Sequence, residues 1–273
     1  MSTQRLSTAA AAALALAAVV SVFSPARAEE LALQKSASAI EAKYNGLDMG
    51  ILTLGPTMSA AEAKAALIKE YGDVLNVSEG TIGISYKSIP LESQVYTTRI
   101  AATKPGDEIS VLFGTPATGN TVVNMTRRLT FEDARTAPEA GAVLAQLVSK
   151  YGNPSHNKPA VTGRASEMYR LTWVFDTKGP KPCPTSGCWV VYSSFQVDQL
   201  ADEKRRLATG HAVEIMATAF THSSDGNRVR TLEVTANYVA NKVLTLEEAF
   251  QQFQKAGEEL YRKSATPAAA PKL

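Results

Sequence analysis

The chain has 273 residues, of which 45% are hydrophobic, and it carries 28 basic and 26 acidic side chains. This length can bury a proper core, as one large domain or as two small ones. The near-neutral charge argues against a dedicated binder of nucleic acid or of anionic membranes, because such proteins need a basic surface.

Residues 1–28 are predicted to be a secretory signal peptide. Arg5 supplies the positive start, an apolar run of mostly Ala, Leu and Val follows, and Ala26-Arg27-Ala28 forms a small-residue cleavage site. The alternative, a membrane anchor, is disfavoured by the Ser and Thr inside the run and by its small-residue exit. Cleavage would leave 26 basic and 26 acidic residues and no later run long enough to span a bilayer. The mature protein is therefore expected to be periplasmic or secreted, with no transmembrane segment.

Residues 29–57 are predicted to hold a short helix and a lead-in strand. Apolar residues recur at helical spacing over 29–44, and an Asn-Gly pair ends that pattern. A short strand is expected over 47–54, where a Gly-Pro pair stops it.

Three predicted helices share one start signal, a Ser or Thr followed three residues later by Glu. The pairs are Ser59 with Glu62, Thr136 with Glu139, and Thr245 with Glu248. In such a capping box the hydroxyl accepts from a backbone N–H and the carboxylate reaches back to the cap. An apolar stripe follows each start, and the first two helices end in Tyr71-Gly72 and Tyr151-Gly152, where glycine suits a left-handed cap. We therefore predict helices over 59–73, 136–153 and 245–262.

Period-two alternation follows each of the first two helices, which is typical of antiparallel strands. The alternating segments cover 82–86, 95–102, 109–113 and 122–129, and then 169–175, 189–197, 213–219 and 231–238. The pattern predicts an α+β fold of two tandem units, 58–133 and 134–263, each a helix packed on a four-stranded antiparallel sheet, with a C-terminal helix and a disordered tail over 264–273. Either the units are a true internal repeat, or an ordinary α+β protein shows the same order of elements twice.

The helix boundaries of the two units carry a family resemblance. The residues concerned are Ser59-Ala60-Ala61-Glu62 with Tyr71-Gly72, and Thr136-Ala137-Pro138-Glu139 with Tyr151-Gly152-Asn153-Pro154. A helix with this start and end, followed by four antiparallel strands and used in tandem, resembles the β-lactamase-inhibitor-protein-like domains and the related small outer-membrane assembly lipoprotein domain. The resemblance implies an envelope-associated binding module rather than an enzyme. The chain lacks a lipid-attachment Cys, so a lipid anchor is not implied, and no binding residues of the family have a match here.

The two cysteines, Cys183 and Cys188, enclose a Pro-Thr-Ser-Gly loop. In an oxidising compartment this spacing favours a structural disulfide. The alternative is a redox pair, but that motif normally has two intervening residues at a helix start, and here there are four in a Pro-containing loop.

No pattern in the sequence indicates a catalytic, cofactor or metal site. The histidines His156, His211 and His222 show no metal-ligand spacing. A nucleophile elbow, a dinucleotide fingerprint and a P-loop are all missing from the sequence. An enzyme would therefore need a site assembled from residues distant in the chain.

The candidate binding residues are Trp173, Trp189 and Tyr192, which surround the Cys loop, and Arg127. The aromatic side chains are either core residues or, if exposed, recognition anchors. Arg127 and its neighbour Arg128 point to opposite faces of a strand, so one of them is a candidate for an exposed binding position.

These observations favour a non-catalytic periplasmic or secreted protein that binds another protein or an envelope component through a sheet face or the Cys loop. The alternatives are an enzyme with a site built from distant residues, and a carrier that holds a small ligand in a cleft between the two units. No cofactor and no nucleic-acid partner are expected.

Overall fold

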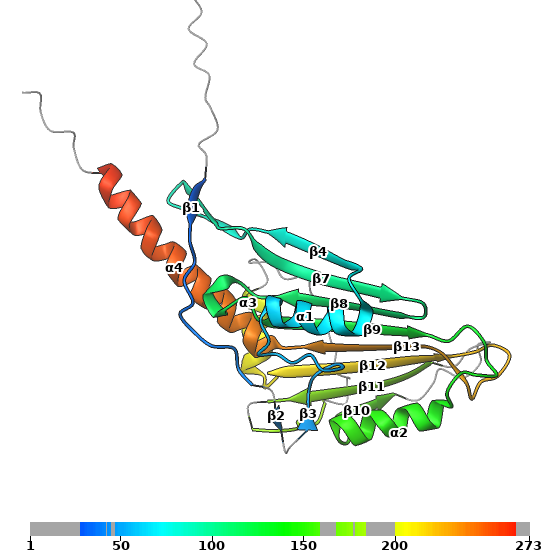
Figure 1. Cartoon of the computed structure of the whole chain (residues 1–273). Coiled ribbons are helices and arrows are strands. Elements are labelled where there is room, and N and C mark those ends of the chain that lie inside the picture. The colour runs from blue at the N-terminus through cyan, green and yellow to red at the C-terminus, as the bar shows by residue number, and fades with distance from the viewer. Residues whose placement is uncertain are drawn as a thin grey trace, which may run out of the picture.

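An eight-stranded antiparallel sheet forms the centre of the part of the protein that the structure describes (Figure 1). The computed structural model describes residues 28–41, 43–44, 47–158, 168–176, 178–183 and 200–265. In order across the sheet, the strands are β10 (His156–Lys158), β11 (Met168–Phe175), β12 (Val213–Thr221), β13 (Val229–Asn237), β9 (Val122–Thr130), β8 (Asp107–Phe113), β7 (Tyr96–Lys104) and β4 (Leu75–Gly80).

In the described part of the chain, two small sheets accompany the large one. The first joins β1 (Glu29–Leu31), β6 (Ile89–Ser93) and β5 (Gly83–Tyr86), and the second joins β2 (Lys43–Tyr44) and β3 (Leu47–Asp48). The predicted α+β class is confirmed.

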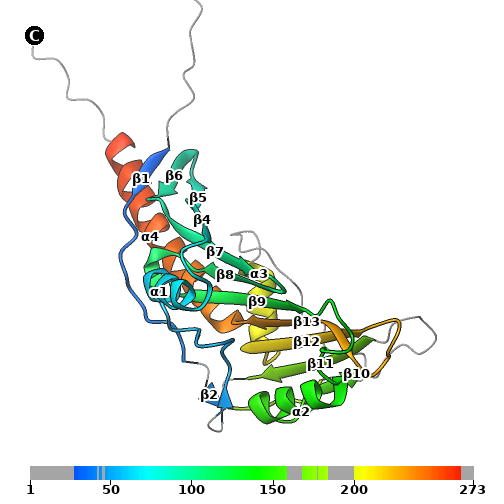
Figure 2. The same cartoon turned by 45° about the vertical axis from the view of Figure 1, so that its right-hand side comes forward.

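Two helices of equal length, α1 (Ala60–Tyr71) and α2 (Ala140–Tyr151), lie on the same face of the large sheet (Figures 1 and 2). Their apolar stripes and that face of the sheet share one core. The other helical elements of the described ranges are η1 (Pro116–Thr118), α3 (Leu200–Ala208) and α4 (Val239–Ala265). α4 contacts η1, α3 and the small β5–β6 hairpin, and its C-terminal part projects beyond the large sheet (Figure 1). Within the described residues, no helix is both long and apolar enough to cross a membrane.

The two predicted units meet along their last strands. Residues 58–133 supply β4, β7, β8 and β9, and residues 134–263 supply β10 to β13. β9 pairs antiparallel with β13, from Asn124 opposite Asn237 to Thr130 opposite Thr231. The strands therefore form one continuous sheet where the sequence suggested two separate ones. We call β9 and β13 the seam strands.

The helix ends of the two halves have matching geometry. The N–H of Ala60 donates to the Asn120 carbonyl at 2.9 Å, and the N–H of Ala140 donates to the Asn227 carbonyl at 2.8 Å. In each half the start of the helix is thus tied to the turn that precedes the seam strand. The C-caps also match, because Gly72 and Gly152 have φ of 78° and 79° and ψ of −168° and −170°.

One of the three predicted capping boxes forms. Ser59 and Glu62 bond reciprocally at the start of α1, as predicted. α2 begins later than predicted, at Ala140: its N-cap is Glu139, which makes no side-chain cap bond, and the Thr136 hydroxyl donates to a loop carbonyl instead.

The predicted start of the last helix at Thr245 is also wrong. α4 begins at Val239, directly after β13, and Thr245 lies buried inside it. The Thr245 hydroxyl accepts a hydrogen bond from the N–H of Thr115 at 2.8 Å, so it joins α4 to the turn around η1 rather than capping a helix.

The N-terminal region differs most from the prediction. The helix expected over 29–44 is not formed: residues 29–31 are strand β1, and residues 32–41 are mostly irregular. The lead-in strand shortens to β3, which is followed by a tight turn over residues 51–54. The segment expected as the first strand of the large sheet, 82–86, belongs to the small sheet, and β4 takes its place.

Several other predictions fall on residues outside the described ranges. These are the signal peptide up to residue 27, the strand over 189–197 and most of the tail over 264–273. β11 pairs directly with β12 along its whole length. The charged segment between β11 and β12 in the chain contains α3.

Candidate functional site: a groove over the seam strands

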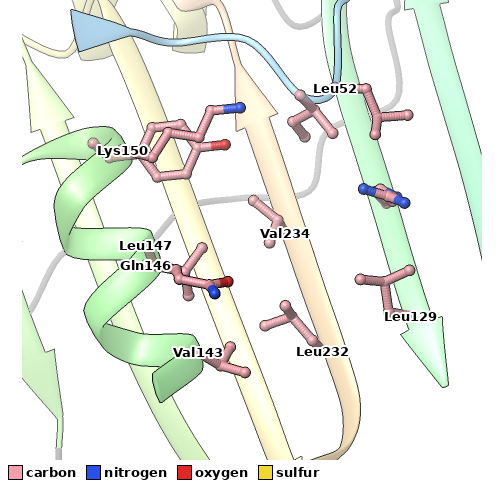
Figure 3. A pocket seen from close by; sticks show the side chains of 11 residues that line it. Leu52, Leu129, Val143, Gln146, Leu147, Lys150, Leu232 and Val234 are labelled. Atoms are coloured by element: carbon pink, nitrogen blue, oxygen red, sulfur yellow. The ribbon is translucent and has the colours of Figure 1, made fainter. Parts of the chain in front are cut away.

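A groove with a cavity volume of about 240 Å³ lies above the seam strands, beside α2 (Figure 3). Its walls are mainly aliphatic. The strand side presents Leu129, Leu232 and Val234, and α2 presents Val143 and Leu147. The polar side chains that line it are Gln146, Lys150, Tyr151 and Arg127.

The groove exists because neither helix covers the seam. α1 packs on β7 and β4, and α2 packs against β12, so each helix sits over strands away from the middle of the sheet. Side chains alternate between the two faces of the sheet along β9 and β13, and this alternation places Leu129 and Val234 on the face that carries α1 and α2. The joining of two half-covered sheets thus leaves apolar strand residues between the helices.

A tight turn over residues 51–54 closes one end of the groove. The N–H of Ile51 and the N–H of Leu54 each donate to the other residue's carbonyl, at 3.1 and 3.0 Å. Leu52, at the tip, has a φ of 56° and contributes its side chain to the groove (Figure 3). A left-handed conformation costs a leucine roughly 1–2 kcal/mol, so the surrounding structure must hold the turn in place.

Two buried tyrosines supply that support. The Tyr151 hydroxyl donates to the Gly50 carbonyl at 3.0 Å, and the Tyr238 hydroxyl donates to the Met49 carbonyl at 2.9 Å. Burial raises the pKa of both hydroxyls, so they remain protonated donors at neutral pH. One hydroxyl comes from the end of α2 and the other from the end of β13, and together they fix the turn over the groove.

Arg127 extends from β9 into the groove and is anchored by a carboxylate at its back. Its Nε and Nη2 donate to the two oxygens of Asp107 at 2.9 and 2.8 Å. The Tyr71 hydroxyl donates to Asp107 Oδ1 at 3.0 Å. Burial alone would raise the pKa of Asp107, but the hydrogen bonds from Arg127 and Tyr71 outweigh it and the pKa is lowered. Asp107 therefore stays ionised and holds one edge of the guanidinium.

Lys150, in the last turn of α2, is the second cation of the groove. Its side chain is half-buried, and its ammonium points towards the side of the groove where Leu52 lies (Figure 3). No carboxylate of the described residues lies within 4.0 Å of it, and its Nζ lies 5.3 Å from the centroid of the Tyr151 ring. Burial lowers the pKa of Lys150, with the charge of Arg127 acting in the same direction and that of Asp48 opposing it.

The structure places the sequence-predicted binding residues apart. Arg127 lines the groove, and Arg128 faces the other side of the sheet in an exposed pair with Glu233. Trp173 is fully buried, with its indole N–H donating to the Gly152 carbonyl at 2.8 Å, so it is a core residue and not an exposed anchor. Cys183 is disulfide-bonded.

Three of the predicted positions, Cys188, Trp189 and Tyr192, lie outside the described residues.

Sequence reasoning missed Lys150 and Leu52. Lys150 follows Leu147 at helical spacing and so falls on the apolar stripe of α2, where a charged residue is a signal that could have been noticed. Leu52 gave no signal, because a left-handed leucine is not distinguishable by residue type.

A second group of charged and polar side chains lies on the other face of the sheet, between α3, α4 and the strands β12 and β13. Its members are Glu203, Arg206, His211, Glu214, Asn237 and Lys242. Arg206 bonds to both Glu203 and the fully buried Glu214. Burial alone would raise the pKa of Glu214, but the hydrogen bonds from His211 and Arg206 outweigh it and the pKa is lowered. Because the charged members of this group pair with one another, their arrangement fits the attachment of α3 to the sheet better than a reactive site.

The described residues contain no group of three or more His, Cys, Asp or Glu side chains arranged to hold a metal ion. No protein-family model, no curated protein and no solved structure matches this chain. The functional conclusion therefore rests on the groove.

Proposed function

We propose that this chain is a non-catalytic binding protein of the periplasm or extracellular space, and that its ligand occupies the groove over the seam strands. The observation that carries the proposal is an apolar hollow bounded by the seam strands, α2 and a fixed turn. Ligand sites are typically concave and mostly apolar, with a few placed polar groups that orient the ligand. The groove lies between the two helix-plus-strand halves, as a carrier with a cleft between its units would require.

The chemistry of the groove favours binding over catalysis. Its titratable side chains are Arg127, Lys150 and Tyr151. Arg127 is paired with Asp107, and the Tyr151 hydroxyl is occupied by the Gly50 carbonyl. Covalent catalysis needs a nucleophile within hydrogen-bond reach of a base, and the described lining residues do not provide such a pair.

The proposed compartment follows from the sequence and one structural feature. The signal-peptide pattern directs the chain out of the cytoplasm, and disulfides such as that of Cys183 persist in oxidising compartments.

The test is methyl NMR of the protein from residue 29 onward, titrated with n-octanol as a neutral apolar probe. We expect the methyl signals of Leu129, Leu232 and Val234 to shift, and those of Leu33 and Leu246, which belong to a separate apolar cluster, to stay in place. Saturable shifts confined to the groove methyls would support the proposed site. The absence of any shift of these methyl signals on addition of octanol would contradict it.

A matched pair of variants on α2 sharpens the test. Gln146 is exposed and lines the groove, so Gln146→Trp is expected to fill it and abolish the octanol shifts. Ala145 is also exposed but does not line the groove, so Ala145→Trp is expected to leave the octanol shifts unchanged. Equal binding by both variants would move the site elsewhere.

A second candidate function, binding to another protein, is favoured by the edge strand β4. Within the described residues β4 pairs only with β7, and Val74, just before the strand, and Val77, within it, are 77% and 37% exposed. A partner could add a strand there through main-chain hydrogen bonds. We expect Val77→Lys to weaken such an interaction and to leave octanol binding in the groove unchanged. The measurement is the loss of a protein that crosslinks to wild-type β4 in periplasmic extract.

A further inference from the structure

Arg127 lines the groove and keeps N–H donors that Asp107 does not use. An arginine has five N–H donors, and Asp107 accepts one from Nε and one from Nη2. Nη1 has no hydrogen-bond partner among the described residues, and it is not buried. It is therefore a pair of donors available to whatever enters the groove.

The second cation, Lys150, is also uncompensated. Its Nζ lies in the same groove without a carboxylate of the described residues in ion-pair range. The nearest acidic influence is that of Asp48, whose carboxylate already accepts a hydrogen bond from the N–H of Gly50 at 2.9 Å. Two cations in a partly desolvated groove repel each other, which costs free energy. An anion bound between them offsets the repulsion and the loss of hydration of both charges.

The rest of the groove is apolar and small. Leu129, Leu232, Val234, Val143 and Leu147 form its floor and one wall. Its volume of about 240 Å³ is below the roughly 300–1,000 Å³ that is usual for drug-sized ligands. The occupant that matches both features has a short apolar chain and a single anionic end.

We propose, building on the binding function above, that the groove selects a small free amphiphilic carboxylate, with its chain on the seam-strand leucines and its carboxylate held by Lys150 Nζ and Arg127 Nη1. The seat for the anion combines one point charge with one planar donor group, which together can satisfy both carboxylate oxygens. The small volume favours a free acid over a bulky lipid.

The experiment compares three probes of equal chain length, octanoate, n-octanol and octylamine, by isothermal titration calorimetry on the protein from residue 29 onward. Hydrogen bonds to charged groups predict that octanoate binds about ten- to hundredfold tighter than octanol. Octylamine is expected to bind more weakly than octanol, because it adds a third cation to the groove.

Two variants test whether Lys150 causes the preference for octanoate over octanol. Lys150→Met keeps the volume of the side chain and removes its charge, so octanoate affinity should fall about tenfold while octanol affinity is maintained. Lys69→Met makes the same change on the exposed surface of the last turn of α1, and should alter neither affinity.

The outcomes separate the two proposals. If octanol and octanoate bind equally, or if Lys150→Met leaves octanoate affinity unchanged, the carboxylate assignment is overturned and the binding groove stands. If none of the three probes binds, the groove fails as a ligand site and the carboxylate assignment fails with it.

Discussion

The ion pair between Asp107 and Arg127 should be a major source of stability beneath the groove. Asp107 accepts hydrogen bonds from both Nε and Nη2 of Arg127, and it also accepts one from Tyr71. We expect Asp107→Asn and Arg127→Met each to destabilise the fold, and the double variant to cost less than the sum of the two.

The magnitude follows from the burial of the pair. Removing one partner of a buried pair costs about 3–5 kcal/mol, because the other charge is left uncompensated. The side chain of Asp107 is 7% exposed and that of Arg127 is 22% exposed, so water offsets part of the loss. We expect about 3 kcal/mol for each single variant and a coupling free energy of about 2 kcal/mol between them.

The assay is urea denaturation followed by circular dichroism at pH 7, repeated at falling pH. Because the pKa of Asp107 is lowered in the folded protein, its stabilisation is present above the unfolded pKa and is lost as the pH falls through the folded value. The stability difference between wild type and Asp107→Asn should therefore shrink below about pH 4. Additive single variants, or a difference that is independent of pH, would refute this account of the pair.

Two further predictions concern the opposite face and the N-terminus. Glu214→Gln removes the buried charge that faces Arg206 and should lower the free energy of unfolding by about 3 kcal/mol. The control Glu258→Gln, in an exposed pair, should change it by less than about 0.5 kcal/mol. Similar effects of the two variants in the same urea assay would contradict the interpretation of Glu214 as part of a buried charge network. Expression of the full chain in a bacterium should yield a periplasmic protein whose intact mass begins at Glu29, the first residue of β1; retention of residues 1–28 in a membrane fraction would contradict the signal-peptide prediction.

Local signals in the sequence identified several elements correctly. Ser59 and Glu62 form the predicted box because both partners are within three residues and need no tertiary contact. Gly72 and Gly152 end α1 and α2 in positive-φ conformations, which glycine adopts at little cost. Arg127 was also among the candidate binding residues, on the basis of strand alternation, and it does line the groove.

Where the same local signal competed with a distant contact, the contact prevailed. Glu139 forms a bridge with Arg228, and the Pro138 carbonyl accepts from the N–H of Val229, so α2 begins only after this pairing. Thr245 has the sequence of a cap, but its hydroxyl is engaged by Thr115, which is 130 residues away in the chain. A capping box is worth about 1 kcal/mol, which such packing easily exceeds.

The sequence by itself determined the α+β class and much of the element order, since hydrophobic period and turn residues are properties of neighbouring positions. Only the tertiary structure decided that β9 pairs with β13, that the two halves share one sheet, and that Lys150 and Arg127 face the same groove. Strand pairing joins segments about a hundred residues apart, and its free energy comes from side chains buried across the seam rather than from either strand alone. The groove arises from that pairing, so no single stretch of the sequence predicts it.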